Sequence, residues 1–160
     1  MFNFLWNNIW GQMLMTLLVS MVPVIELRGA IPLATAHGLD FRIAIPLAII
    51  GNLIPVPFII IFIRKIFAWI RKHLPKLDGF IGKLEGRAQS KSETVQKYAF
   101  WGLFLFVAIP LPGTGAWTGA LIAAMLDMRL KKAFPSIVLG VLTAGAIVAI
   151  VSYGALAIFT

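Results

Sequence analysis

The stretch YAFWGLFLFVAIPLPGTGAWTGALIAAML, residues 98–126, contains no charged side chain, and yet it is not expected to form one regular helix. Proline removes a backbone amide donor and disfavours helix in the residue before it, and glycine admits turn conformations, so residues 110–115, PLPGTG, should end a helix. They divide the run into two apolar arms, each too short for a hydrocarbon core that takes about 20 helical residues to cross. The pattern predicts a re-entrant helical hairpin.

Three further segments lack charge: residues 1–25, 43–63 and 133–160. With 60% hydrophobic residues, 12% charged residues and a mean hydropathy of +0.93, the chain has more apolar surface than a soluble core could hide. The alternating segments of roughly ten residues that a membrane β-barrel requires do not occur. The composition therefore predicts an all-α integral membrane protein that crosses the bilayer more than once.

Basic residues are concentrated between the two apolar halves. The formal net charge is +8, and nine of the 14 Lys and Arg residues lie in 64–97. Loops rich in Lys and Arg stay in the cytoplasm, so this charge indicates a cytoplasmic linker and not a nucleic-acid site. The linker is expected to be amphipathic and to lie on the inner leaflet, and the alternative is a solvated basic segment. We expect a first unit at 1–63, the linker at 64–97 and a second unit at 98–160, in a bacterial inner membrane with both termini outside.

The two units repeat each other at an offset of 87 positions. Pro23 meets Pro110, the sequence Leu-Asp-x-Arg occurs twice, and after a two-residue insertion Gly51 meets Gly140. Such collinear matches are typical of an internal repeat. If the linker is cytoplasmic, the nearly neutral turn at residues 40–42 lies outside and the basic turn at residues 127–132 lies inside. The two units then enter the membrane from opposite faces, so the repeat is expected to be inverted. Each unit would consist of a re-entrant helical hairpin and one transmembrane helix.

The first hairpin is less sharply marked than the second. Its arms are predicted at residues 5–22 and 24–38, with a break at Pro23 and a second kink at Pro32. The first arm is long enough to be a true span. The first hairpin is therefore either re-entrant or fully spanning.

Residues 26–32, ELRGAIP, place a carboxylate and a guanidinium inside an apolar segment. A charge at that depth costs about 2.5 to 3.5 kcal/mol on insertion scales, so both groups should face a cavity or a partner. In one interpretation Glu26 carries a proton and Arg28 attracts an anionic substrate group. The alternative is a structural ion pair, or a pair at the membrane edge that anchors a helix end.

Other polar groups extend this candidate site. The second break has no charge, but its glycines expose backbone amides and Thr114 is a candidate cap for the arm that follows, which would create an anion site or only a turn. Asn52, in a charge-free helix, is expected to hydrogen-bond across to a hairpin. The predicted substrate-binding or proton-binding residues are Glu26, Arg28, Asn52, Pro110, Pro112, Gly113, Thr114 and Gly115. Asp40 and Asp127, at turns, are expected to be helix caps.

Enzyme and cofactor chemistry find no support in the sequence. There is no cysteine, no pair of histidines at metal-ligand spacing, no nucleophile elbow and no phosphate loop with a lysine. We therefore predict no catalytic residue, no metal and no cofactor.

Residues 26–32, the pair Gly51-Asn52 and residues 108–115, AIPLPGTG, resemble the signatures of the small multi-drug export proteins, and the likeness covers nearly the whole chain. The hairpin-plus-helix plan is also similar to the DedA superfamily, with which polyprenyl-phosphate and phospholipid translocation and proton coupling are associated. That similarity implies an acidic residue in the first hairpin, which Glu26 matches. It also implies an arginine in or after the second hairpin, where only Arg129, at the turn, is available, and the similarity therefore adds Arg129 to the predicted substrate-binding or proton-binding residues.

The leading hypothesis is a proton-coupled secondary transporter or lipid flippase that moves an anionic lipid-linked phosphate. One alternative is a small multidrug exporter of cationic amphiphiles, and another is a membrane scaffold that transports nothing. The expected partners are membrane lipids, a small-molecule or lipid substrate, protons and a second copy of the chain in a homodimer. Nucleic acid is not among them.

Overall fold

A computed structural model describes residues 6–73, 79, 92–111 and 113–159, and this part of the chain is helical with no strand. The helices are α2 (Ile9–Met21), α3 (Glu26–Ala36), α4 (Phe41–Leu53), α5 (Pro55–His73), α7 (Ser92–Ala108), α8 (Ala116–Met125) and α9 (Leu130–Phe159). The all-α prediction is confirmed.

Two helical stretches of the described chain are long and apolar enough to cross a membrane. They are Phe41–Ile63, which joins α4 to the first part of α5, and Leu130–Ala155 in α9, each with a mean hydropathy of 2.3. Only 28% of the first and 39% of the second is buried inside the protein. Most of their apolar surface is therefore open, as lipid-facing helices require and the core helix of a soluble protein does not.

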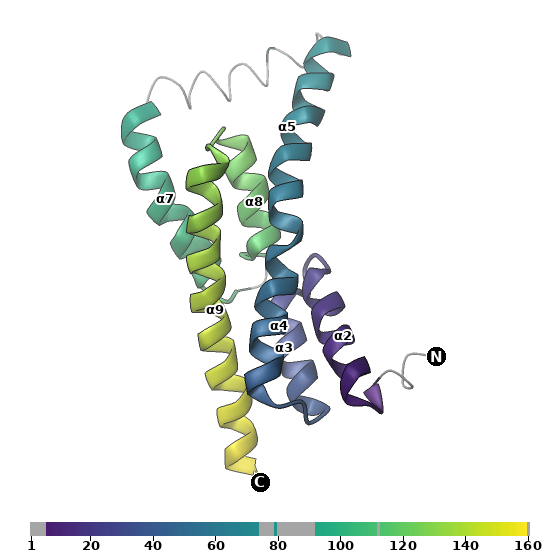
Figure 1. Ribbon diagram of the computed structural model, residues 1–160. Coiled ribbons are helices and arrows are strands. Elements are labelled where there is room, and N and C mark those ends of the chain that lie inside the picture. Colours follow the sequence, from purple (N-terminus) through teal and green to yellow (C-terminus); the bar gives the residue numbers. More distant parts are fainter. Residues whose placement is uncertain (1–5, 74–78, 80–91, 112, 160) are drawn as a thin grey trace.

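The two halves have the same order of elements. In Figure 1 the turn between α2 and α3 and the turn between α7 and α8 both lie near the middle of the molecule, and each hairpin points its turn towards the other. The α4–α5 pair and α9 run past them in opposite directions. Irregular backbone from both halves therefore meets at one level of the bundle.

A glycine in each half lets the long helix approach the first arm of its hairpin. A Cβ at Gly51 would lie 2.0 Å from Ser20 Oγ on α2, and a Cβ at Gly140 would lie 2.6 Å from Val107 Cβ on α7. Ser20 and Val107 are themselves 87 positions apart in the sequence. The two glycines that the predicted repeat aligns thus both lie against the first helix of their own half.

The first arm is shorter than the sequence analysis predicted. It was expected at residues 5–22, whereas α2 covers Ile9–Met21 and has 13 residues. Asn8 starts the helix, because its Oδ1 accepts hydrogen bonds from the amides of Trp10 and Gly11 at 2.7 and 3.3 Å. The prediction followed the long apolar run and did not use Asn8 as the N-cap that starts the helix.

Three other local predictions have mixed outcomes. The helix break at 110–115 is confirmed, since α7 ends at Ala108 and α8 begins at Ala116. Pro32, where a second kink was predicted, lies inside α3, which continues to Ala36. Asp40 is a helix cap as expected, because its Oδ1 accepts from the amide of Arg42 at 2.8 Å at the start of α4.

The linker boundaries fall within helices. α5 continues past residue 64 to His73, and α7 begins at Ser92 within the basic segment. The rest of the predicted amphipathic linker, apart from residue 79, lies outside the described residues. α9 begins at Leu130, three residues before the apolar run predicted from 133.

The main core lies where the hairpins pack between the long helices. Its largest buried side chains are Leu27, Ile31, Val56, Ile60, Val107, Ile137 and Val141. Alanines of α3, α4, α8 and α9 fill the space between them and permit close helix approach. This packing holds the two breaks against each other.

Candidate functional site

The first break, residues 22–25, places Glu26 at the start of α3. Val24 and Glu26 have φ values of +76° and +49°, in the left-handed region, which costs a residue with a side chain about 1 to 2 kcal/mol. The amide of Glu26 donates to the carbonyl of Val22 at 3.0 Å. The tight turn is therefore built from strained non-glycine residues, and it directs the Glu26 side chain into the interior, where only 4% of it is exposed.

The carboxylate of Glu26 caps a helix of the other half. Its Oε1 accepts a hydrogen bond from the backbone amide of Trp117, in the first turn of α8, at 3.0 Å. Gly115, the N-cap residue of α8, has no side chain to do this. A carboxylate at a helix N-terminus is stabilised by about 0.3 to 1 kcal/mol at exposed positions and up to about 2 kcal/mol in partly buried ones. The indole Nε1 of Trp117 donates to the carbonyl of Met21, the last residue of α2, at 3.1 Å. We call this region, where the break at residues 22–25 meets the break at residues 109–115, the junction.

Gly115 is required here by space and not by backbone conformation. Its φ of −93° is open to any residue, but a Cβ at this position would lie 1.6 Å from Glu26 Oε2 and 2.1 Å from its carboxyl carbon. The carboxylate therefore lies directly against the backbone that begins α8.

Arg28 holds the other side of the second break. Its guanidinium donates to the carbonyls of Leu111, of Thr114 at 2.6 Å, of Ile109 at 3.3 Å and of Val107 at 3.4 Å. These carbonyls lie in the last turn of α7 and in the break that follows it. A cation stabilises the partial negative charge of a helix C-terminus, so Arg28 caps α7 as Glu26 caps α8.

The carbonyls need this donor because the break supplies few amides. Pro110 has none to give, and the amide of Leu111 bonds to the carbonyl of Ile109 at 2.8 Å and to Thr114 Oγ1 at 3.2 Å. The hydroxyl of Thr114 lies 2.6 Å from the carbonyl of Ile109. Thr114 thus bonds backwards into the break, and the prediction that it caps the following arm is wrong. Gly113, with φ +83°, supplies the turn that only glycine adopts without strain.

The structure brings together Glu26, Arg28, Thr114 and Gly115, with Pro110 and Gly113 in the same break. Pro112 lies outside the described residues. Arg129 is exposed in the turn before α9, and its carbonyl accepts the amides of Lys132 and Ala133 at the start of that helix. It does not join the cluster.

Glu26 and Arg28, both in the described part, do not pair with each other within ion-pair distance; each binds backbone of the second break. Asn52 is only 1% exposed, and its Oδ1 has no hydrogen-bond partner among the described residues. This oxygen therefore does not accept the hydrogen bond that was expected between Asn52 and a hairpin.

Some residues that take part in the junction could not be predicted from the sequence. Trp117 joins it through its backbone amide and indole nitrogen, and the carbonyls of Val107, Ile109 and Leu111 through main-chain atoms that carry no residue signature. One signal existed, since the 87-residue offset aligns Glu26 with Gly113 and Arg28 with Gly115, a charged pair against bare backbone.

The chemistry open to this junction is the binding of a proton or a charged ligand. Within the described ranges there is no group of three or more His, Cys, Asp or Glu side chains that could hold a metal ion. At this junction the ionisable groups are the buried carboxylate of Glu26 and the partly buried guanidinium of Arg28, and both bind backbone atoms.

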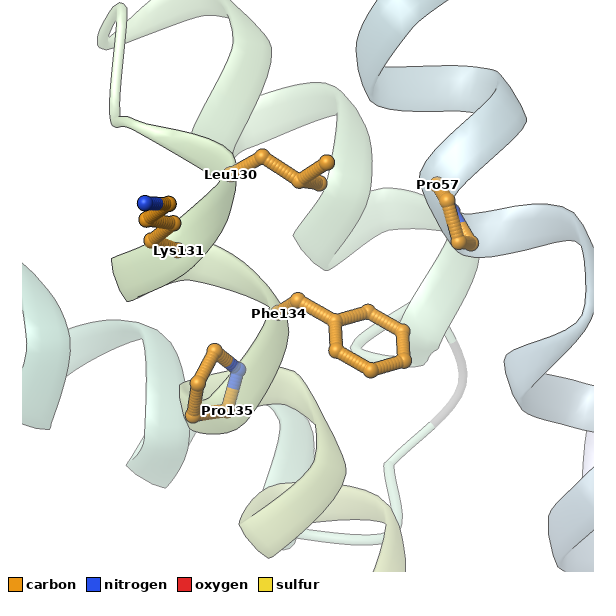
Figure 2. A pocket seen from close by; sticks show the side chains of 5 residues that line it. All are labelled: Pro57, Leu130, Lys131, Phe134 and Pro135. Atoms are coloured by element: carbon orange, nitrogen blue, oxygen red, sulfur yellow. The ribbon is translucent and has the colours of Figure 1, made fainter.

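A separate groove of about 390 Å³ lies between α5 and the start of α9. Figure 2 shows the residues that line it, Pro57 from one side and Leu130, Lys131, Phe134 and Pro135 from the other. None of the predicted site residues contributes to this groove.

The family assignment rests on the segment that contains the junction. Residues 26–147 match the family described as "Putative small multi-drug export protein", and this range begins at Glu26 and includes both sides of the second break. No curated protein and no solved structure matches the chain. The match covers well over half of the sequence, and the chain belongs to the small multi-drug export protein family.

Proposed function

We propose that the protein is a proton-coupled exporter of cationic amphiphiles and that the junction of the two breaks is its exchange site. The observation that carries this proposal is Glu26, a carboxylate that is 4% exposed and lies among apolar helices. Among the acidic side chains that the structure describes, Asp40 and Asp127 are exposed. The family's description as export proteins supports the same function.

A single buried carboxylate gives the simplest form of coupling. It attracts either a proton or a cationic substrate, and an intramembrane ionisable residue is by default a functional candidate for this reason. Because both ligands compete for the same oxygens, arrival of a proton expels the cation. Export then follows the inward proton gradient.

The contacts of Glu26 provide the link to a conformational change. Protonation removes the negative charge from its hydrogen bond with the amide of Trp117 and from the N-terminus of α8. A charge-assisted bond exceeds a neutral one by about 1 kcal/mol, which is a factor of about 5 in a two-state equilibrium. The proton therefore loosens the contact between the two hairpins.

Asn52 supplies a second oxygen for a cation in this proposal. It lies between two buried residues one helical turn away on either side, Ala48 and Val56. These two residues belong to the same core cluster as Leu27 and Ala116, which follow Glu26 and Gly115 in the sequence. An ammonium group with N–H bonds satisfies an acceptor for which the described residues provide no donor.

The proposal includes the inverted arrangement. Each half is a re-entrant hairpin followed by a membrane-crossing helix, with the linker in the cytoplasm and both termini outside. The shortness of α2, α3 and α8, at 13, 11 and 10 residues, supports re-entry, as do the opposite directions of the long helices in Figure 1. Irregular backbone is tolerated at membrane depth where protein covers it, and Arg28 and Glu26 bind the backbone of this break.

A second candidate function is movement of a lipid-linked phosphate, the activity that the DedA-like plan suggests. Arg28 favours it, because its Nε is buried and has no hydrogen-bond partner among the described residues. Guanidinium groups bind phosphates through paired N–H donors. The remaining nitrogens already bind four carbonyls, so a phosphate would have to displace part of the α7 cap, and this ranks the candidate second.

The test uses proteoliposomes that contain the full chain. Glu26→Gln keeps an acceptor for the Trp117 amide, so the protein should still fold and elute as one species, yet proton-driven uptake of a fluorescent amphiphilic primary ammonium compound should fall to the level of empty vesicles. Asp40→Asn, which neutralises an exposed carboxylate, is the matched control and should transport normally.

The other outcomes decide between the alternatives. Unimpaired cation uptake by Glu26→Gln rules out the exchange site. Movement of a fluorescent polyprenyl phosphate that is lost in Arg28→Lys, with no cation uptake by the unmodified protein, assigns the second function. Absence of both activities in a well-folded sample points to a scaffold.

A further inference from the structure

The groove between α5 and α9 owes its shape to two prolines and to the way the helices are held. α5 packs mainly on α8, and α9 packs mainly on α7, so the two long helices make little contact with each other at this level. Pro57 faces the groove from α5 and Pro135 from α9, and their short rings do not fill the space (Figure 2). A volume of about 390 Å³ remains, within the range of about 300 to 1,000 Å³ typical of ligand sites.

The lining is apolar on one side and cationic at one end. Pro57, Leu130, Phe134 and Pro135 offer carbon surface, and Lys131, which is exposed, offers an ammonium group (Figure 2). Lys131 is the second residue of the membrane-crossing stretch Leu130–Ala155. The groove therefore lies where a bilayer changes from headgroups to acyl chains.

Charge around the groove selects the sign of a ligand. Arg129, Lys131 and Lys132 are exposed within four residues, and Asp127 is the acidic residue of the same turn. A cationic amphiphile is repelled by this excess of positive charge, and a free inorganic anion gains nothing from the apolar lining. A ligand that satisfies both features has an anionic head and an apolar chain.

We infer that the groove binds one anionic phospholipid, with its headgroup phosphate at Lys131 and an acyl chain against Pro57 and Phe134. This lipid is a bound partner and not the transported substrate, since Glu26 and Arg28 do not line the groove. The inference requires only that the chain lies in a membrane, so it stands or falls separately from the exchange site.

Native mass spectrometry of the purified full chain, with equimolar dioleoyl phosphatidylglycerol and dioleoyl phosphatidylcholine, tests the inference. The unmodified protein should retain phosphatidylglycerol at least about 5-fold more than phosphatidylcholine, because one lysine near an anionic headgroup is worth about this factor. Lys131→Gln should remove most of the preference. Lys65→Gln, an exposed lysine of α5 outside the groove, is the matched control and should keep it.

A second variant tests the apolar part without a change of charge. Pro57→Phe should fill the groove from the α5 side and lower retention of both lipids. Equal losses in Lys131→Gln and Lys65→Gln would show only diffuse attraction to a basic surface and overturn the site. Displacement of the lipid by glycerol phosphate as effectively as by intact phosphatidylglycerol, or unchanged retention in Pro57→Phe, would also overturn it.

Discussion

The two helix breaks in this chain differ in the kind of polar group that they contain. Residues 22–25 turn through strained non-glycine positions and lead into two charged side chains, Glu26 and Arg28. Residues 109–115 turn through proline and glycine and offer no charge, only amides and carbonyls. Alone, each break would be costly in an apolar medium, the first for its charges and the second for its freed backbone groups. Placed against each other, each break satisfies the polar groups of the other.

This comparison explains why the positions aligned by the 87-residue offset differ at the two breaks. The positions that match Glu26 and Arg28 in the second half are Gly113 and Gly115. A second charged pair would face the first, and a second bare break would leave both sets of backbone groups without partners. Gly115 also leaves the space that the Glu26 carboxylate occupies.

The largest loss of stability is expected when the Arg28 guanidinium is removed. Arg28→Ala deprives the carbonyls of Leu111 and Thr114 of their charged donor, and because such a hydrogen bond contributes about 1.5 to 3 kcal/mol, the protein should lose about 3 to 6 kcal/mol of stability. The measurement is the temperature at which the detergent-solubilised protein loses its monodisperse elution peak. Arg42→Ala, at an exposed arginine over the ring of Phe41, should change it little. Similar melting of the two variants would show that Arg28 does not hold the break.

A second test fills the space between the breaks. Gly115→Ala puts a methyl group 1.6 Å from Glu26 Oε2 and should displace the carboxylate from the start of α8, at about 1 to 3 kcal/mol. Gly102→Ala is the matched control, because a Cβ there meets nothing within 4 Å and alanine favours helix over glycine. Thermal melts of the two variants should move in opposite directions. A Gly115→Ala protein as stable as the original would mean that the carboxylate does not occupy this place.

The smallest test asks whether the two halves also pack alike. Gly51→Ala and Gly140→Ala should both lower the melting temperature, each by roughly 1 to 3 kcal/mol of stability. The effect at Gly51 should be the larger, because its Cβ would lie 2.4 Å from the backbone carbonyl oxygen of Leu17, whereas the nearest backbone atom at Gly140, the carbonyl oxygen of Phe104, would lie at 3.0 Å. Gly145→Ala, whose nearest neighbour is the flexible end of Ile49 at 3.3 Å, is the control. Loss of stability in one half only would break the parallel.

Local chemistry accounts for what could be predicted. The helix break before Ala116 and the cap at Asp40 are confirmed, because a missing amide or a short acidic side chain acts within a few residues. The start of α2 was predicted too early, since the hydrophobic run masked the cap at Asn8. The role of Thr114 was also wrong, because which way a hydroxyl bonds depends on how the break folds.

By itself the sequence determined the class of protein and the positions of the second break and of the charged pair. These follow from apolar length and from the backbone chemistry of proline and glycine, which are properties of short segments. Only the tertiary structure decided what the charges bind. Glu26 and Arg28 are between 79 and 91 positions from the amide and carbonyls that they hold, and those partners are main-chain atoms that carry no residue signature. The packing of the two hairpins decides which main-chain atoms Glu26 and Arg28 bind, and no pattern of side chains in the sequence identifies those atoms.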